Sequence, residues 1–172
     1  MSLNLPKTFT MTRVSPTIEE LQFMHKWCTK NVLQKAKILE FGAGPTTWAI
    51  HKAVNPSLYV AVEDWPSTVK DVMNHLSDVK IVKSTWFDIP EEEYDFIFVD
   101  SSAGYPPKSP GLHRDEAAKY GERLLKKGGF IMLHDWRKRS GKGPRQYLES
   151  NGYKLVDSLR GRTGVGVYQY ED

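Results

Sequence analysis

Several acidic side chains and one histidine stand close to the ends of apolar segments in this sequence. They are Glu40, Glu63, Asp64, Asp100, His134 and Asp135. A carboxylate accepts hydrogen bonds from hydroxyl and ammonium groups, and it can bind a divalent cation through oxygen. Histidine has the intrinsic pKa of a base near neutrality. Binding of a hydroxylated or cationic ligand, and transfer of a proton, are therefore the chemistry that these residues could perform.

A glycine turn follows the first of these acids. In the segment KILEFGAGPTTWAI, residues 37–50, Gly42 and Gly44 allow a tight turn and close approach of a ligand to the backbone. A helix expected from Pro45 to about Val54 would offer free N–H groups and the positive end of its dipole. The acid pair at 63–64 comes about twenty residues later, which is the spacing of a carboxylate that holds ribose hydroxyls. The pattern predicts a nucleotide-like ligand.

Two details argue against a nicotinamide dinucleotide. Its fingerprint has a third glycine, whereas position 47 is threonine. A diphosphate would not explain Glu40, which suits a ligand with a cationic or hydroxylated end. The alternative is that Glu40 only caps the turn. No Gly-Lys-Ser/Thr follows the turn, which excludes a phosphate-binding loop.

Strands and helices alternate along the chain. Continuous apolar runs at 37–41, 96–99 and 130–133 indicate parallel strands buried on both faces. The expected helices span 15–34, 45–54, 67–76, 109–129 and 143–152, and the expected strands span 36–41, 57–65, 79–86, 94–100, 129–135, 153–161 and 163–171. A capping box of Thr17 and Glu20 opens the first helix, which should bury Ile18, Leu21 and Met24 or His25. The prediction is one α/β domain over residues 1–172 with an N-terminal helix, built on a Rossmann-like, doubly wound, mostly parallel sheet of seven strands that ends in an antiparallel hairpin.

Composition and charge limit the partners and the cellular compartment to be expected. The 172 residues carry a formal charge of +3, too mild to argue for a nucleic-acid partner, and a single cysteine, Cys28. One cysteine allows no internal disulfide and fits a reducing compartment. The N-terminus has no apolar signal core, and no segment approaches membrane-spanning length. We therefore expect a cytoplasmic protein without a membrane partner.

Four motifs in order resemble the class I S-adenosylmethionine-dependent methyltransferases. These are ILEFGAG, YVAVEDW, YDFIFVDSSAG and LLKKGGFIMLHD. The resemblance implies that Gly42, Ala43 and Gly44 lie against S-adenosylmethionine and that Glu63 or Asp64 binds its ribose. It also implies that Asp100 borders the cofactor, while Trp86 stacks on adenine and Asp88 accepts from its amino group; the alternative for Trp86 is a surface tryptophan that packs on Pro90. The segment DIPEEE is too short for the usual helix, so one flank of the sheet would be uncovered and could form a homodimer surface.

Methyl transfer requires alignment of the acceptor above all, and a hydroxyl acceptor also benefits from a base or a metal. Asp100, His134 and Asp135 are the candidate catalytic residues, and a divalent metal could bind Asp100 and Asp135. A purely structural His134 is the alternative. Ser101 and Ser102 do not indicate a hydrolase, because the Gly-x-Ser-x-Gly elbow is missing and adjacent strand residues point apart.

A finer resemblance concerns the acceptor. VDSSAGYPPKSPG, residues 99–111, and the His-Asp pair at 134–135 resemble the glucuronoxylan 4-O-methyltransferases. The segment that follows is strongly basic and could grip a carboxylate or phosphate, or could be a solvated loop. Its basic residues are Arg137, Lys138, Arg139, Lys142 and Arg145.

The leading hypothesis is O-methylation of a small or sugar-like anionic acceptor. A non-catalytic cofactor-binding module and a nicotinamide-dependent oxidoreductase are the alternatives. A nucleic-acid methyltransferase is disfavoured, since no Asn/Asp-Pro-Pro-aromatic motif follows the fourth strand.

Overall fold

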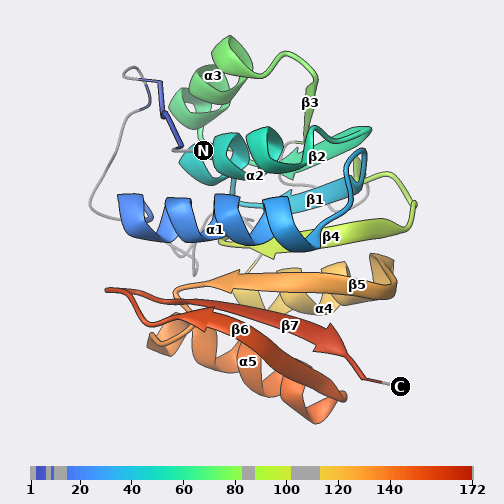
Figure 1. Ribbon diagram of the computed structural model, residues 1–172. Coiled ribbons are helices and arrows are strands. Elements are labelled where there is room, and N and C mark those ends of the chain that lie inside the picture. Colours follow the sequence, from blue (N-terminus) through green and yellow to red (C-terminus); the bar gives the residue numbers. More distant parts are fainter. Residues whose placement is uncertain (1–2, 7–8, 10–14, 83–87, 102–112, 172) are drawn as a thin grey trace.

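The computed structural model describes residues 3–6, 9, 15–82, 88–101 and 113–171. Figure 1 shows its helices and strands in chain order. The helices are α1 (Ile18–Asn31), α2 (Pro45–Val54), α3 (Pro66–His75), α4 (Arg114–Leu124) and α5 (Arg139–Ser150). The strands are β1 (Lys37–Phe41), β2 (Leu58–Val62), β3 (Val79–Val82), β4 (Tyr94–Val99), β5 (Leu125–His134), β6 (Tyr153–Leu159) and β7 (Val165–Tyr170).

The strands form a single sheet of seven in the order β3-β2-β1-β4-β5-β7-β6. The first five strands are parallel, whereas β7 is antiparallel to both of its neighbours. The chain leaves β1 in one direction to build β2 and β3, then returns to place β4 on the other side of β1. This reversal confirms the predicted doubly wound sheet with a C-terminal antiparallel hairpin. Ligands of such sheets bind at the carboxyl ends of the strands beside the reversal.

Both faces of the sheet are covered. Because side chains alternate along a strand, Phe96 and Phe98 of β4 join one core cluster, whereas Ile97 and Val99 join the other. The first cluster includes the buried faces of α1, α2 and α3, and the second includes residues of α4 and α5. All four of these β4 side chains are fully buried, as continuous apolar strands predict.

Helix α1 begins as expected. The Thr17 hydroxyl accepts from the Glu20 N–H, and the Glu20 carboxylate accepts from the Thr17 N–H. Leu21 and Met24 are fully buried, but the expectation for Ile18 is wrong, since 51% of its surface is exposed. The inward position near the start of the helix is taken by Glu20, which has no exposed surface.

The boundary between α4 and β5 differs from the prediction. The helix ends at Leu124 rather than near Gly128, and the strand begins at Leu125 rather than at 129. Leu125 pairs with Tyr94 of β4, so sheet pairing takes over residues that have helix-forming side chains. Gly129 suits this strand because a Cβ there would lie 2.8 Å from the carbonyl oxygen of Asp95.

Helix α5 begins four residues earlier than predicted, at Arg139 instead of 143, and contains Pro144. The two glycines near its start are needed for close packing. A Cβ at Gly141 would run into the backbone of Asp135 and Trp136, and one at Gly143 would run into the Asp115 carboxylate. The basic segment is therefore only partly a loop, because Arg139, Lys142 and Arg145 lie on this helix.

The connection from β3 to β4 contains no α-helix in its described part, residues 88–93, where only Asp88 has 3₁₀ geometry, in agreement with the short spacing. The homodimer surface expected at this flank remains a prediction. Among the helices in the described ranges, none is long and apolar enough to cross a membrane.

Candidate cofactor and acceptor site

The glycine turn packs directly against the end of β4. Gly42 has a φ of +93°, which L side chains rarely adopt, and a Cβ there would lie 2.7 Å from the carbonyl oxygen of Asp100. Backbone hydrogen bonds join the Gly42 N–H to the Val62 carbonyl and the Asp100 N–H to the Phe41 carbonyl. The turn and Asp100 are thereby brought together, as the sequence predicts.

The surroundings of Gly44 differ from those of Gly42. Among the residues that the structure describes, and apart from the two chain neighbours of Gly44, no atom lies within 4 Å of the position that a Cβ would occupy on this residue. Its N–H donates to the hydroxyl of Thr47, and α2 begins at the next residue. The turn therefore has open space beside Gly44, next to the N-terminus of a helix, where an electronegative ligand group is favoured.

Of the two acids after β2, Glu63 lies closer to the turn. Its carboxylate accepts from the N–H groups of Asp64 and Trp65, at 2.9 and 2.8 Å, and interacts with the backbone of Ala43. Burial raises the pKa of Glu63. Asp64 is exposed and lines a hollow of about 430 Å³ along α3.

Glu40 lies underneath the turn. It is fully buried, and its two oxygens accept from the hydroxyls of Thr46, Thr47 and Tyr59 at 2.6 to 2.9 Å. Burial raises the pKa of Glu40 to about 8. These contacts match the alternative in which Glu40 holds the turn, because its described hydrogen-bond partners are all internal. The expected contact with a ligand finds no support in this geometry.

The end of β4 is joined to the end of β5 by a residue that sequence reasoning missed. Arg114, at the start of α4, places its guanidinium between Asp100 and Asp135, with N···O distances of 2.8 and 3.1 Å. Asp135 also pairs with Lys138 at 3.0 Å. Although burial works in the opposite direction, Lys138, His134 and Arg114 lower the pKa of Asp135. Because Arg114 falls inside the helix predicted over 109–129, its charge gave no signal of this role.

His134 is fully buried between two acids. Its Nδ1 lies 2.8 Å from Asp100 Oδ1, and its Nε2 lies 2.9 Å from Thr163 Oγ1 and 3.5 Å from Glu20 Oε2. Burial lowers the pKa of His134, but Asp100 and Glu20 outweigh it and raise the pKa to about 9. A histidine that is protonated at neutral pH and engaged at both nitrogens fits the structural alternative better than a general base.

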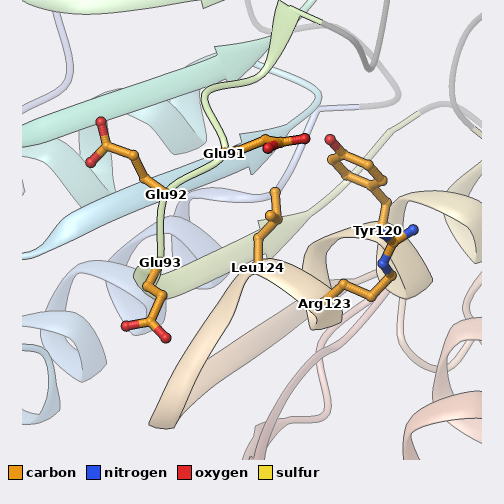
Figure 2. A pocket seen from close by; sticks show the side chains of 6 residues that line it. All are labelled: Glu91, Glu92, Glu93, Tyr120, Arg123 and Leu124. Atoms are coloured by element: carbon orange, nitrogen blue, oxygen red, sulfur yellow. The ribbon is translucent and has the colours of Figure 1, made fainter.

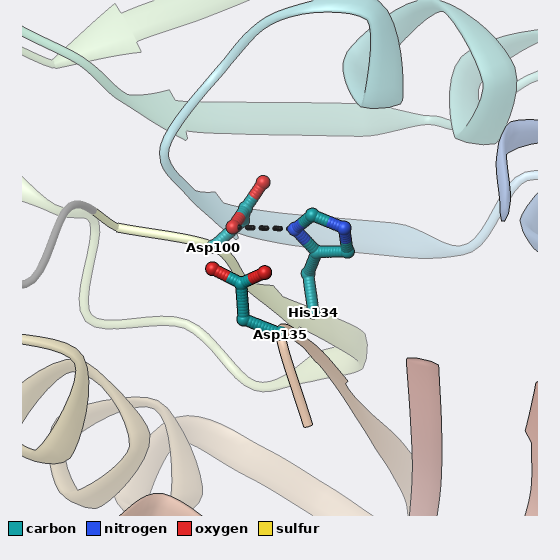
Figure 3. A group of neighbouring side chains, drawn as sticks. All are labelled: Asp100, His134 and Asp135. Atoms are coloured by element: carbon teal, nitrogen blue, oxygen red, sulfur yellow. Dashed lines mark hydrogen bonds and ion pairs between the residues drawn. The ribbon is translucent and has the colours of Figure 1, made fainter. Parts of the chain in front are cut away.

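Figure 3 shows how the three predicted catalytic side chains lie. Asp100 and His134 point toward each other, and the carboxylate of Asp135, which follows β5 and has a φ of +54°, lies beside them. Ligand atoms of the three residues lie within 4.8 Å of one another. The structure thus brings Asp100, His134 and Asp135 together, within one network of ion pairs.

Some predicted site residues lie elsewhere. Trp86 and residues 102–111 of the VDSSAGYPPKSPG segment are outside the described residues, and Asp88 is exposed.

Figure 2 shows a pocket of about 340 Å³ lined by Glu91, Glu92, Glu93, Tyr120, Arg123 and Leu124. Because Glu93 precedes β4 and Asp100 follows it, this pocket lies at the edge of the sheet opposite the glycine turn.

No protein-family model and no curated protein matches the chain. Solved structures do. An O-methyltransferase from Bacillus cereus in complex with S-adenosylhomocysteine (SAH) aligns with a TM-score of 0.69 at 14% identity, over 93% of this chain and 84% of that one. The O-methyltransferase TomG from Streptomyces achromogenes, in complex with S-adenosylmethionine, aligns with a TM-score of 0.66 at 16% identity, over 92% of this chain and 82% of that one.

A precorrin-6y C5,15-methyltransferase from Geobacter metallireducens aligns with a TM-score of 0.68 at 16% identity, over 93% of this chain and 92% of that one. At such identities the likeness establishes the fold. The chain has the fold of the S-adenosylmethionine-dependent methyltransferases, in agreement with the strand order of its sheet. Since two of these structures are named O-methyltransferases and the third a precorrin-6y C5,15-methyltransferase, the fold does not specify the acceptor.

Proposed function

We propose that this protein is an S-adenosylmethionine-dependent methyltransferase that transfers a methyl group to oxygen of a small or sugar-like anionic acceptor. The observation that carries the proposal is the space beside Gly44 that the described residues leave open, in the turn that follows the carboxyl end of β1. That is the position at which a doubly wound sheet binds its ligand. The solved structures of the same fold that contain S-adenosylmethionine or SAH support the choice of cofactor.

Under this proposal, the residues in and around the glycine turn have distinct roles in cofactor binding. Gly44 leaves room for the ligand, and Glu63 accepts hydrogen bonds from the ribose hydroxyls, assisted by Asp64. Glu40 positions the turn from below through its hydroxyl partners. S-adenosylmethionine supplies an electrophilic methyl group on a sulfonium, so the protein's task is to align the acceptor oxygen with it.

Basic side chains support an anionic acceptor. Arg137 and Lys138 follow β5, and Arg160 lies in the turn between β6 and β7. The two turns touch, because the Arg137 N–H donates to the Thr163 carbonyl. These three side chains are exposed, and Lys138 alone among them has a described carboxylate partner. Exposed guanidinium groups near the carboxyl end of β5 could bind a carboxylate or phosphate of the acceptor.

A pair of glycine variants tests the cofactor assignment. Gly44→Leu fills the open space, and we expect SAH binding to be lost while the fold, followed by circular dichroism, persists. Gly128→Leu is the matched control, because a Cβ there also meets no atom within 4 Å but the residue lies at the far end of β5. Equal SAH affinity in the Gly44→Leu variant and the wild type would refute the assignment.

The acceptor assignment is tested by SAH release from a panel of neutral sugars and uronic acids. We expect turnover with the acids only. With the best acceptor, Arg137→Gln and Arg160→Gln should raise KM about tenfold or more without changing SAH affinity. Lys80→Gln, an exposed lysine on β3, is the control. Turnover of the neutral sugars, or no effect on KM, would contradict the anionic acceptor.

A non-catalytic cofactor-binding protein is the second candidate, and one observation favours it. Asp100, His134 and Asp135 are all engaged in internal ion pairs, so none of them is a free base. Methyl transfer to an acceptor oxygen that is already ionised needs no base, which keeps the enzyme as the first candidate. SAH binding without methyl transfer to any compound of the acid panel would favour the second.

A further inference from the structure

The three residues that could bind a metal surround a guanidinium group. Arg114 lies at the start of α4, and its side chain is only 5% exposed. We infer that Arg114 occupies the cation position between Asp100 and Asp135, so that the ends of β4 and β5 are held together without a divalent metal. The part of this inference that concerns catalysis rests on the proposed function, whereas the occupancy of the position does not.

The geometry of Arg114 is that of a clamp. Its Nη2 lies 2.8 Å from Asp100 Oδ1, and its Nη1 lies 3.1 Å from Asp135 Oδ2. The Nε–H donates to the carbonyl of Ser101 at 3.1 Å, and Nη1 donates to the carbonyl of His134 at 3.4 Å. A planar guanidinium can satisfy acceptors in several fixed directions at once, which a lysine cannot. Both carboxylates and both strand ends are therefore held by one side chain.

A divalent ion does not fit this arrangement as it stands. Oxygen ligands of Mg²⁺ or Ca²⁺ lie between about 2.0 and 2.6 Å from the ion. Asp100 Oδ1, however, already has Arg114 Nη2 and His134 Nδ1 at 2.8 Å each. To bind an ion between the two aspartates, the protein would have to displace the guanidinium from its buried carbonyl partners. Leaving such groups unpaired is costly.

The local charges lead to the same conclusion. Asp100, Asp135 and Glu20 supply three carboxylates, and Arg114, Lys138 and the His134 ring face them. The acids already have cationic partners, so a further double positive charge would have no unpaired carboxylate to neutralise it. Under the proposed function Arg114 is a positioning residue, because it holds Asp100, whose backbone contacts the glycine turn.

Binding of Mn²⁺, followed by the electron paramagnetic resonance signal of the free ion, tests the inference without cofactor or acceptor. The wild type should leave the free signal unchanged at equimolar Mn²⁺. Arg114→Met removes the guanidinium but keeps the length of the side chain, and it should bind Mn²⁺ at least about tenfold more tightly than the wild type. Arg114→Met combined with Asp135→Asn should lose that binding. Arg114→Gln, which keeps one donor, replaces Arg114→Met if circular dichroism shows that the latter does not fold.

Stoichiometric Mn²⁺ binding by the wild type would overturn the inference, and so would the absence of binding in a folded variant without Arg114. SAH titration of the wild type separates this result from the proposed function. If SAH does not bind but the Mn²⁺ results are as expected, the proposed function fails while the cation position of Arg114 stands.

Discussion

Glu40 should make the stability of the protein fall as the pH rises. The carboxyl is fully buried under the glycine turn and accepts from three hydroxyls, and its pKa is about 8 instead of the ordinary 4.5. The folded protein thus holds a proton that the unfolded chain releases near pH 4.5. The contribution of Glu40 is complete below pH 4.5 and is lost as the pH rises toward 8.

The size of the effect follows from the two pKa values. Each tenfold difference in proton affinity corresponds to about 1.4 kcal/mol. The interval from 4.5 to about 8 therefore corresponds to a loss on the order of 5 kcal/mol in the free energy of unfolding. Glu40→Gln removes the titration. Because the hydroxyls of Thr46 and Thr47 can accept as well as donate, the amide keeps hydrogen-bond partners.

Urea unfolding of the wild type and Glu40→Gln, followed by circular dichroism between pH 4.5 and 8, measures the effect. The difference between the two proteins cancels groups that titrate equally in both. We expect similar stabilities near pH 4.5 and a clear advantage of Glu40→Gln at pH 8. Parallel curves over the whole range would refute the reasoning, since Glu40 would then be charged in the folded protein throughout.

Three other substitutions or reactions have direct readouts. Gly42→Ala should cost on the order of 3 kcal/mol in urea unfolding, because φ is +93° and the new Cβ would meet the Asp100 carbonyl, and a loss below 1 kcal/mol would contradict this. Glu20→Gln should cost on the order of 3 kcal/mol at pH 7, and this cost should shrink progressively as the pH falls below 4.5 toward the strongly lowered pKa of Glu20 in the folded protein. Burial raises the pKa of Glu20, but its hydrogen bonds to His134 and Thr163 lower it by more, so the stabilisation by Glu20 is lost as the pH falls well below 4.5; equal costs at pH 7 and near pH 2 would exclude this. Burial raises the pKa of the Cys28 thiol, so it should react with a disulfide reagent only after unfolding; rapid reaction of the folded protein would contradict its burial.

Much of the fold could be predicted because local patterns and global packing agree. Apolar runs such as 96–99 are buried from both sides, and the glycine turn at 42–44 is where the first strand ends. The start of β5 at Leu125 could not be predicted. Lys126 and Lys127 have good helix propensity, and only pairing with β4 decides that they are extended. The start of α5 at Arg139 instead of 143 has a similar reason, because the close packing of Gly141 against the backbone of Asp135 is a tertiary contact.

The sequence predicted where the site residues lie in the fold better than it predicted which side chains they contact. The sequence places Asp100 and His134 after strands, and parallel strands bring their carboxyl ends together. Whether a buried acid faces a ligand or a neighbouring side chain depends on distant residues. Glu20, 143 residues before Thr163, binds both Thr163 and the ring of His134, and no spacing rule relates them.

Calorimetric titration of the wild-type protein with SAH, beside a nicotinamide dinucleotide, tests the central proposal most directly. If S-adenosylmethionine binds beside Gly44, as proposed, SAH should bind with a Kd on the order of micromolar and the dinucleotide should not bind. Absence of SAH binding, or preference for the dinucleotide, would contradict it.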